Sequence, residues 1–488
     1  MSSSSSSRTW DTCFENRYQA RLSAEEPVLP VGFPGGGERD PFGASALGVF
    51  LEGRGGSRLG VDYSRLNPFL DRLARFVQDK AHRAKARHEI MHGFGGLALA
   101  YLVAWERFPQ LYGPSPTLGD PAGAPWKDRA EVERLALRYL RKAEESAGSA
   151  RSLTFLNGTS GLDALKVAFL CAGLLPFSTP KIQDAVSRLL STEPSSSPAS
   201  DTPDELFYGR AGYLYALRFV VRYLDRSREF SLSPVAASLL QQLGDACLRV
   251  QEAIYTRGVH HMLQDHSRSP IMYQWHGKCY LGGAHGLSGI LYVMLDGALP
   301  SAVLPPFDSD LPLLKRTLDF IATVRFKSGN YPSREGSRDD RLVQFCHGAT
   351  APALMYLQAH RALGDSSYLL LAAEAAEVVW QRGLLKKGVG LCHGISGSIM
   401  VFLKLHHATR DTMWMARALC FVDFVVSEQP IPTGDGADGL WCQPDQPYCL
   451  YNGAAGLLCT LHELLLVLRF PDHHPSWPGF DLPSFLQE

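Results

Sequence analysis

A short motif, Gly-x-x-Gly followed by an apolar run, recurs along this chain and constrains its fold more than any other feature. Six copies keep both glycines, and a seventh has Ala351 in place of the second. The first glycines of the seven copies stand at positions 93, 158, 209, 286, 348, 394 and 453. Self-similarity along a chain is the signature of a fold that repeats one structural unit. We therefore expect seven related units.

Each motif predicts the start of a buried helix. Glycine permits the close backbone approach that a tight entry turn needs. The runs that follow, such as 212–224 and 456–468, are apolar on nearly every side, and a helix without a polar face must be buried all round. Segments between motifs, such as 127–146 and 367–383, carry the one-sided apolar stripe of surface helices. This alternation predicts an all-α fold, an (α/α)7 double-layer toroid of seven inner and seven outer helices. An open solenoid is the competing arrangement.

The repeats also suggest the domain organisation. Residues 71–488 are expected to form one toroidal domain. Residues 1–70 begin with a serine run and contain a Gly- and Pro-rich stretch, and we expect them to form a partly disordered N-terminal extension. Within the toroid, the segment "STEPSSSPASDTP" at 191–203 is expected to be a low-complexity surface loop.

Charge and composition limit the classes of partner. A formal net charge of −1 argues against a nucleic-acid-binding surface, which needs an excess of Lys and Arg. The chain has no uncharged apolar run of about 18 residues, so no transmembrane segment is expected. Its start lacks the apolar region of a secretory signal. Ten cysteines in such a chain indicate reduced thiols and a cytoplasmic location. Peripheral contact with the plasma membrane is left open, although no basic amphipathic anchor stands out.

The turns before the buried helices are where a site is expected, because a ring would gather all of them at one end. The residue before each first glycine is therefore a candidate. These residues are His92, Asn157, Tyr208, His285, His347, His393 and Asn452. Four of them are histidines, in a chain that has 16, which favours a site for metal or acid–base chemistry.

Two of the motifs begin with Cys-His-Gly, which suggests a metal site. Thiolate and imidazole are preferred ligands of Zn²⁺, and three protein ligands leave one coordination position open. Cys346, Cys392 and His393 are the candidate ligands. His347 would be either a fourth ligand that closes a structural site or a residue beside an open catalytic site. In the alternative interpretation, both cysteines are buried core thiols and the histidines cap helices.

An open zinc site with two thiolates suits thiol chemistry. Such a site binds a further thiol and lowers its pKa. Addition of the resulting thiolate to an activated alkene then requires an acid that delivers a proton. His285 is the candidate acid, and Glu205 could orient it. Alternatively, His285 caps a helix and Glu205 is a first-turn carboxylate that faces the helix dipole.

Three further residues are candidates for substrate binding. Lys387 lies a few residues before Cys392, where a cation could hold an anionic substrate. The alternative is a solvated basic turn. Tyr208 and Arg210 are expected to line the same opening, and for these two the pattern alone does not choose between substrate binding and a structural role.

Four segments resemble a known family. "LVQFCHGA", "LLKKGVGLCHGISGS", "DELFYGRAGYLYAL" and "YLGGAHGLSGILY" are similar to the eukaryotic LanC-like proteins, relatives of the bacterial lanthionine cyclases. The similarity runs from about residue 90 to residue 470. The resemblance implies an α/α toroid with one zinc held by Cys346, Cys392 and His393. It also places the family's acid–base histidine on His285. Glu205 falls where bacterial members have an aspartate.

The resemblance also implies an activity. The chain would bind glutathione and add its thiol to dehydroalanine or dehydrobutyrine residues of proteins, as a zinc-dependent glutathione transferase of lanthionine-cyclase type. Lys387 falls where eukaryotic relatives contact glutathione. The chain departs from the family at Cys442, near which relatives carry an arginine, and at Leu342, where the bacterial arginine is not evident. A non-catalytic glutathione-binding adaptor or signalling protein with a structural zinc is the alternative, and a prenyltransferase-like α/α barrel is a third.

Overall fold

The computed structural model describes residues 13, 50–51, 59–60, 63–83, 85, 87–112, 128–148, 153–197, 200–296, 311–428 and 446–483. Within these ranges the regular secondary structure is almost entirely helical. The exceptions are two short antiparallel strands, β1 (Phe50–Leu51) and β2 (Leu59–Gly60), and four isolated β-bridges. No helix in the described part of the chain combines the length and apolar character that crossing a bilayer requires.

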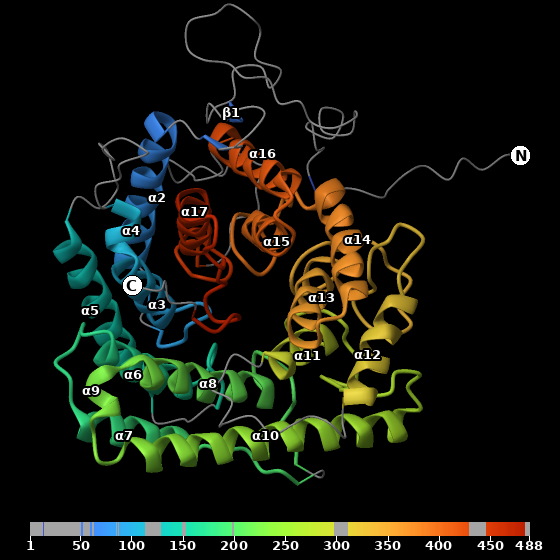
Figure 1. The fold of residues 1–488 in the computed structure, drawn as a ribbon, viewed down its shortest axis with the longest axis horizontal. Coiled ribbons are helices and arrows are strands. Elements are labelled where there is room, and N and C mark those ends of the chain that lie inside the picture. The colour runs from blue at the N-terminus through green and yellow to red at the C-terminus, as the bar shows by residue number, and fades with distance from the viewer. Residues whose placement is uncertain are drawn as a thin grey trace, which may run out of the picture.

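Seven helices surround a central axis and form an inner ring (Figure 1). In chain order they are α3 (Phe94–Glu106), α6 (Thr159–Cys171), α8 (Arg210–Arg226), α11 (Leu287–Leu295), α13 (Thr350–Leu363), α15 (Ile395–Thr409) and α17 (Ala454–Arg469). Each begins within two residues of the first glycine of a motif. Each packs against the next, and α17 packs against α3. The ring is therefore closed, which excludes the open solenoid.

A second ring of helices covers the first. Its members are α2 (Tyr63–Arg83), α5 (Arg129–Ser146), α7 (Thr179–Leu190), α10 (Ala236–Asp265), α12 (Leu311–Thr323), α14 (Ser366–Arg382) and α16 (Thr412–Glu428). Five outer helices pack on the inner helix that precedes them in the chain: α5 on α3, α7 on α6, α10 on α8, α14 on α13 and α16 on α15. Helix α2 packs on α17. Helix α12 meets α13, where the Tyr356 hydroxyl donates to the Leu318 carbonyl over 3.1 Å. Two short helices, α4 (Phe108–Tyr112) and α9 (Arg228–Ser231), complete the set. The predicted (α/α)7 toroid is confirmed.

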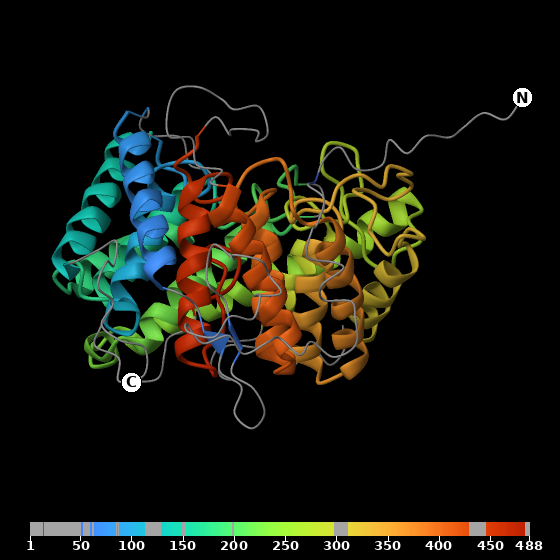
Figure 2. The same ribbon diagram turned by 90° about the horizontal axis from the view of Figure 1, so that it is seen from above.

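The expected boundary at residue 70 falls inside a helix. Helix α2 begins at Tyr63, runs through residue 70 and belongs to the outer ring. In Figure 2 it stands beside the orange and red C-terminal helices. The toroid therefore starts further toward the N-terminus than the repeat pattern indicated, because α2 carries no Gly-x-x-Gly motif of its own.

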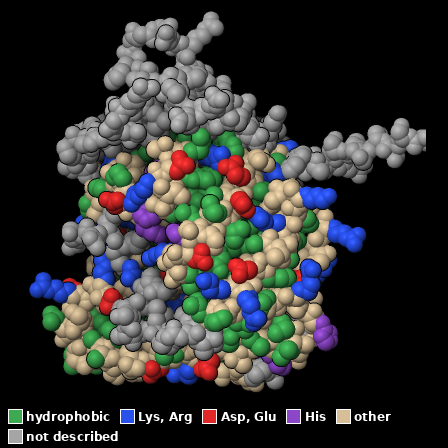
Figure 3. Space-filling view, turned by 45° about the vertical axis from the view of Figure 1, so that its right-hand side comes forward, with side chains coloured by type: hydrophobic (Ala, Val, Ile, Leu, Met, Phe, Trp, Pro, Cys, Tyr) green, Lys and Arg blue, Asp and Glu red, His purple; other side chains and the backbone are tan. Residues whose placement is uncertain are grey.

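Burial follows the predicted difference between the two rings. Every residue of α11 is buried, as the all-round apolar pattern of its motif requires. In the outer helix α5 one face is buried, including Val132, Leu135 and Tyr139, while Glu133 and Arg134 on the other face are exposed. On the face drawn in Figure 3, Lys and Arg side chains are interspersed with Asp and Glu.

The entry turns of the inner helices are tied together at one end of the ring by backbone hydrogen bonds. In each bond a backbone N–H of one turn donates to a carbonyl oxygen of a neighbouring turn. The pairs, donor first, are Met91 and Leu156, Phe155 and Gly212, Gly283 and Phe345, Cys346 and Cys392, Cys392 and Tyr451, and Tyr451 and Met91. The approach is so close that a Cβ on Gly282 would lie 2.0 Å from the carbonyl oxygen of Cys346. Glycine is thus required there, and all seven turns meet on one face.

The C-terminal segment fills the ring below these turns. Trp477 and Phe480 are buried, and the ring centroid of Phe345 lies 4.8 Å from each of theirs. Because Phe345 immediately precedes Cys346, this apolar plug supports the turn that carries the candidate metal ligand.

Candidate metal centre

The structure brings Cys346, Cys392 and His393 together. Their ligand atoms all lie within 4.8 Å of one another. Cys346 comes from the turn before α13, and the other two come from the turn before α15, the next helix around the ring. Cys346 is 9% exposed and Cys392 is 3% exposed, while His393 is half-buried. Two thiols and one imidazole therefore face one another at the end of the ring.

This donor set fits a single zinc ion. Zn–S bonds are about 2.3 Å and Zn–N bonds about 2.0 Å, so tetrahedral ligands of one ion lie roughly 3.5 to 3.8 Å apart. The observed limit of 4.8 Å needs only small side-chain movements to reach that spacing. Within the described residues, the cluster contains no fourth Cys, His, Asp or Glu. The geometry is therefore that of a three-ligand site with one open position.

The two thiols are strongly coupled. Their mutual hydrogen bond holds the pKa of Cys346 well below its ordinary value and raises the pKa of Cys392. The pair thus favours one thiolate and one thiol. The buried side-chain amide of Gln344 donates a hydrogen bond to Sγ of Cys346 over 3.0 Å. This bond stabilises negative charge on the sulfur.

His347 stands beside the cluster rather than in it. Its ring lies 5.6 Å from that of Tyr280. Burial lowers the pKa of His347, and the nearby charges of His285, Lys387 and His393 lower it further, against the opposing effect of Cys346. Of the two roles expected for His347, the structure supports a place beside an open site.

The two adjacent lysines act on different groups. The charge of Lys387 opposes the rise in the pKa of Cys392 that the hydrogen bond with Cys346 causes. Burial raises the pKa of Cys13. The charge of Arg382 and, to a smaller extent, that of Lys386 oppose this rise. The charge of Lys387 therefore acts on the cysteine cluster, whereas that of Lys386 acts on Cys13.

His285 and Glu205 form a hydrogen-bonded pair. Nδ1 of His285 lies 2.8 Å from Oε2 of Glu205, and the Glu205 side chain is only 2% exposed. The same carboxylate accepts hydrogen bonds from the backbone N–H groups of Phe207 and Tyr208. Glu205 therefore contacts both the amides of the turn before α8 and the imidazole of His285, and its role in orienting that histidine stays a prediction. With Nδ1 engaged by the carboxylate, Nε2 is the atom of His285 that remains for proton transfer.

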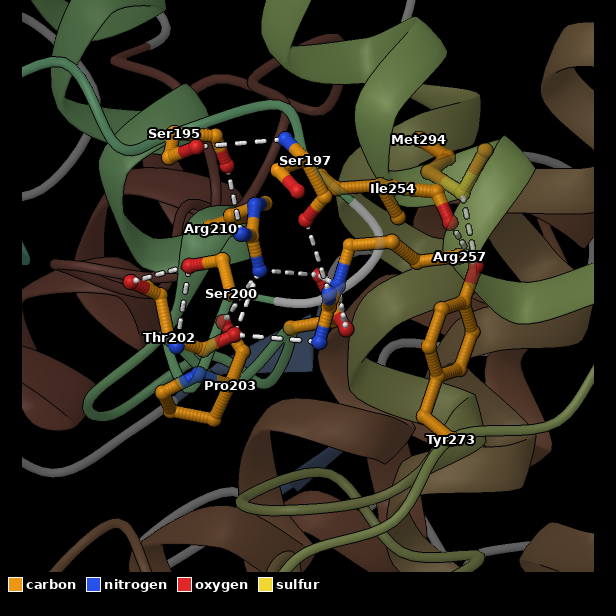
Figure 4. Close-up of polar contacts among 11 residues, drawn as sticks. Ser195, Ser197, Ser200, Thr202, Pro203, Arg210, Ile254, Arg257, Tyr273 and Met294 are labelled. Carbon is orange, nitrogen blue, oxygen red and sulfur yellow. Dashed lines mark hydrogen bonds and ion pairs between the residues drawn. The ribbon is translucent and has the colours of Figure 1, made fainter. Parts of the chain in front are cut away.

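Tyr208 and Arg210, expected at the same opening, point to different places. Tyr208 is 46% exposed, and its ring is stacked with that of His285. Arg210 is fully buried and bonds to Asp204 and to the carbonyl oxygen of Ser195 (Figure 4). The structure therefore gives Arg210 a structural role and not the expected place at the opening.

The loop at 191–203 is held by this arginine and a second one. Asp204 accepts hydrogen bonds from Arg210 over 2.9 Å and from Arg257 over 3.0 Å. Arg257 also donates to the carbonyl oxygen of Ser197 over 3.2 Å. In its described part the low-complexity segment is thus an anchored surface loop that leads directly into Glu205.

Sequence reasoning missed two residues at the centre. Gln344 had no signal beyond its position two residues before Cys346. Trp275 precedes the dipeptide His276–Gly277, a turn signal, and its ring lies 5.6 Å from that of His285. Cys442, where the family pattern differs, lies outside the described residues.

Comparisons with known proteins place this chain among its relatives. The profile of the lanthionine synthetase C-like proteins matches residues 125–474. A zebrafish (Danio rerio) protein named glutathione S-transferase LANCL1 is 34% identical over 382 residues, which cover 77% of this chain and 82% of the relative. The LanC-like protein GCL1 of Arabidopsis thaliana is 34% identical over 282 residues, covering 57% of this chain and 58% of the relative.

A solved structure extends the comparison to the fold. Nisin cyclase matches with a TM-score of 0.54 at 16% sequence identity, covering 83% of this chain and 98% of its own. At that identity the match concerns the fold alone. The sequence match covers most of the chain and includes the three clustered ligands and His285. This protein therefore belongs to the lanthionine synthetase C-like family.

Proposed function

We propose that this protein is a zinc-dependent glutathione transferase that adds the glutathione thiol to dehydroalanine and dehydrobutyrine residues of proteins. The observation that carries the proposal is the cluster of Cys346, Cys392 and His393 within 4.8 Å, in the same ring of turns as the pair of His285 and Glu205. The name of the zebrafish relative, a glutathione S-transferase, supports glutathione as the thiol.

The zinc would be held by Cys346, Cys392 and His393. Zn²⁺ with an open fourth position lowers the pKa of a thiol that binds there and so favours the nucleophilic thiolate. Gln344 would hold the orientation of Cys346 and share its charge through the 3.0 Å hydrogen bond. The apolar plug around Phe345 would keep this turn rigid.

Lys387 and His347 would bind the thiol substrate. Glutathione carries carboxylates, and a lysine whose charge acts on Cys392 is placed to pair with one of them. His347, whose pKa is lowered by burial, would offer a neutral imidazole beside the metal ligands. Both side chains would fix the sulfur near the open position, which favours reaction by proximity.

His285 would complete the addition. The glutathione thiol would release its proton to solvent, from which His285 would recover the proton that it delivers, and the sulfur would form a bond to the β-carbon of the dehydroamino acid. The electron pair of the carbon–carbon double bond moves to the α-carbon, which takes a proton from Nε2 of His285. The net reaction adds S–H across C=C and needs no oxidant or reductant. Glu205 would hold the imidazole in place through Nδ1.

The cellular setting proposed is the reducing cytoplasm. The described cysteines include the free thiols of Cys171, Cys247, Cys346, Cys392, Cys449 and Cys459, as such a compartment maintains. Glutathione and proteins that carry dehydroamino acids are the proposed substrates.

The proposal is tested with the purified protein, glutathione and a peptide that contains one dehydroalanine. We expect one zinc per chain by elemental analysis and a peptide mass increase of one glutathione. His285→Asn should slow the addition by about 10² or more while keeping the zinc. Cys392→Ala should lose both zinc and activity. Cys171→Ala, at the far end of α6, should keep both. A wild-type protein that binds zinc and glutathione but forms no adduct would contradict the proposal and favour the adaptor.

A further inference from the structure

Two aromatic rings lie almost parallel to the imidazole of His285, the proposed acid. The rings of Tyr208 and Trp275 are 5.6 Å apart at an interplanar angle of 11°. The imidazole of His285 lies 6.1 Å from Tyr208 at 5° and 5.6 Å from Trp275 at 16°. Phe207 closes the set from below, edge-on to His285 at 5.2 Å.

These distances show that the rings do not form a closed column. Stacked rings are separated by about 3.5 Å, so the outer two of a three-ring column would be roughly 7 Å apart. No pair among the three exceeds 6.1 Å. The three rings are therefore laterally offset from one another and do not form a three-layer stack. Tyr208 is more exposed than Trp275 or His285, with 46% of its surface accessible. The arrangement is a shelf of aromatic faces next to His285.

A tight turn holds Trp275 in this position. The backbone N–H and carbonyl of Trp275 each bond to Lys278, over 3.1 Å or less. The two residues between them, His276 and Gly277, both have positive φ, at 48° and 68°, as a type I′ turn requires. A positive φ is uncommon for histidine, and strained residues gather at functional sites. The turn presents Trp275 as a fixed surface, so little entropy would be lost when a ligand binds.

We propose that Tyr208 and Trp275 form the acceptor subsite, in which the flat enamide of a dehydroalanine or dehydrobutyrine residue stacks on the two rings. This inference rests on the proposed function and names the group that recognises its protein substrate. The double bond of the acceptor is conjugated with both neighbouring amides, so its α- and β-carbons lie in one plane. The α-carbon of an ordinary residue is tetrahedral and holds its side chain out of any such plane.

Planarity at the α- and β-carbons thus separates the acceptor from a saturated residue such as alanine or serine at the same position. Offset stacking on an aromatic face rewards a flat conjugated group and not a tetrahedral carbon. Because His285 belongs to the same set of parallel rings, an enamide that lies on the shelf is next to the imidazole that would protonate its α-carbon. The shelf would select the unsaturated residue before any bond forms.

The test measures binding without reaction. A dehydroalanine peptide and the identical peptide with alanine are titrated calorimetrically into the zinc-loaded protein in the absence of glutathione. We expect the wild type to bind the dehydroalanine peptide at least about threefold more tightly, in line with ordinary stacking contacts. Trp275→Leu should remove this preference, and Trp275→Phe, which keeps an aromatic face, should retain most of it. Phe470→Leu, which removes a partly exposed ring at the end of α17, is the matched control and should change nothing.

Each outcome decides a different claim. Equal affinities of the wild type for the two peptides, or a preference that survives Trp275→Leu, would overturn the acceptor subsite. If Trp275→Leu fails to fold by circular dichroism, Tyr208→Leu replaces it under the same criterion. If the wild type prefers the dehydroalanine peptide but forms no glutathione adduct, only the proposed transferase activity is contradicted. If the adduct forms but the two peptides bind equally well, only the acceptor subsite of Tyr208 and Trp275 is contradicted.

Discussion

The backbone N–H of Cys346 donates a hydrogen bond to the carbonyl oxygen of Cys392 over 3.3 Å. This bond joins two entry turns that belong to different helices, and it brings the residues that carry the two thiols together. The N–H of Cys392 in turn donates to Tyr451 over 2.8 Å, and a Cβ on Gly390 would lie 2.3 Å from the carbonyl carbon of Asn452. The metal ligands are therefore positioned by the packing of the turns.

The hydrogen bond from Gln344 to Cys346 should strengthen zinc binding. Gln344→Leu removes the donor to the sulfur, and loss of such a supporting contact typically weakens metal affinity by about 10- to 100-fold. Competition with a chromophoric chelator measures this change. Gln358→Leu is the matched control, because Gln358 is also buried but donates to the Leu295 carbonyl, away from the metal centre. Equal zinc affinities of the two variants would refute the role of Gln344.

Glu205 should act through the orientation of His285. In Glu205→Gln a neutral amide replaces the carboxylate that lies against Nδ1, so the imidazole loses the negative charge and the acceptor that would hold it while Nε2 gives up its proton. We expect kcat to fall roughly tenfold or more, a part of the factor that a general acid contributes, with little change in the KM for glutathione. Glu89→Gln is the control. Burial raises the pKa of Tyr208, and the charges of Glu205 and Glu89 raise it further, so Glu89 is near the opening without bonding to His285. A similar kcat in both variants would speak against orientation by Glu205.

The two lysines before Cys392 should differ in their effect on glutathione binding. Lys387→Ala removes the charge that acts on Cys392 and His347, and loss of a charge-assisted hydrogen bond should raise the KM for glutathione about tenfold. Lys386→Ala removes a charge that acts on Cys13 and should leave this KM nearly unchanged. Steady-state kinetics at low and high salt would check both. Equal KM values would mean that general surface charge, not Lys387, attracts the substrate.

Asp204 should be essential for stability. It is 2% exposed and pairs with both Arg210 and Arg257. Asp204→Asn leaves two buried guanidinium groups without their counter-charge, which should lower the free energy of unfolding by about 3 to 5 kcal/mol. Urea denaturation measures the loss. Asp184→Asn, in an exposed pair with Arg188, should change stability by less than about 1 kcal/mol.

Acid should destabilise the fold through His462. Burial, with a smaller contribution from Arg107, lowers the pKa of His462 to about 3. The unfolded chain has the ordinary pKa of about 6.5. Between these values the unfolded state binds more protons, so stability falls as the pH falls through this range, by up to about 1.4 kcal/mol per pH unit for this group. In His462→Gln the decline from pH 6.5 to 5 in urea titrations should be shallower. An unchanged slope would show that His462 does not contribute.

Much of the fold could be predicted because its signals are local. Each Gly-x-x-Gly motif marks one helix start, and the apolar pattern after it indicates burial on all sides, so the seven inner helices followed from short segments. The start of helix α2 at Tyr63 was not predicted, because an outer helix without a preceding motif has no repeat signal. Closure of the ring also depends on contacts between α17 and α3, at opposite ends of the described repeats.

The sequence by itself determined the repeat number, the two helix classes and the cysteines and histidines that could bind a metal, since each depends on residue type and short spacing. Only the tertiary structure decided where neighbouring side chains point. Tyr208 and Arg210 are two residues apart, yet one lies in the turn and faces the opening while the other begins α8 and is buried against Asp204. Gln344 and Trp275 reach the centre through contacts with residues distant in the chain. Such contacts arise from packing, and residue type alone does not specify them.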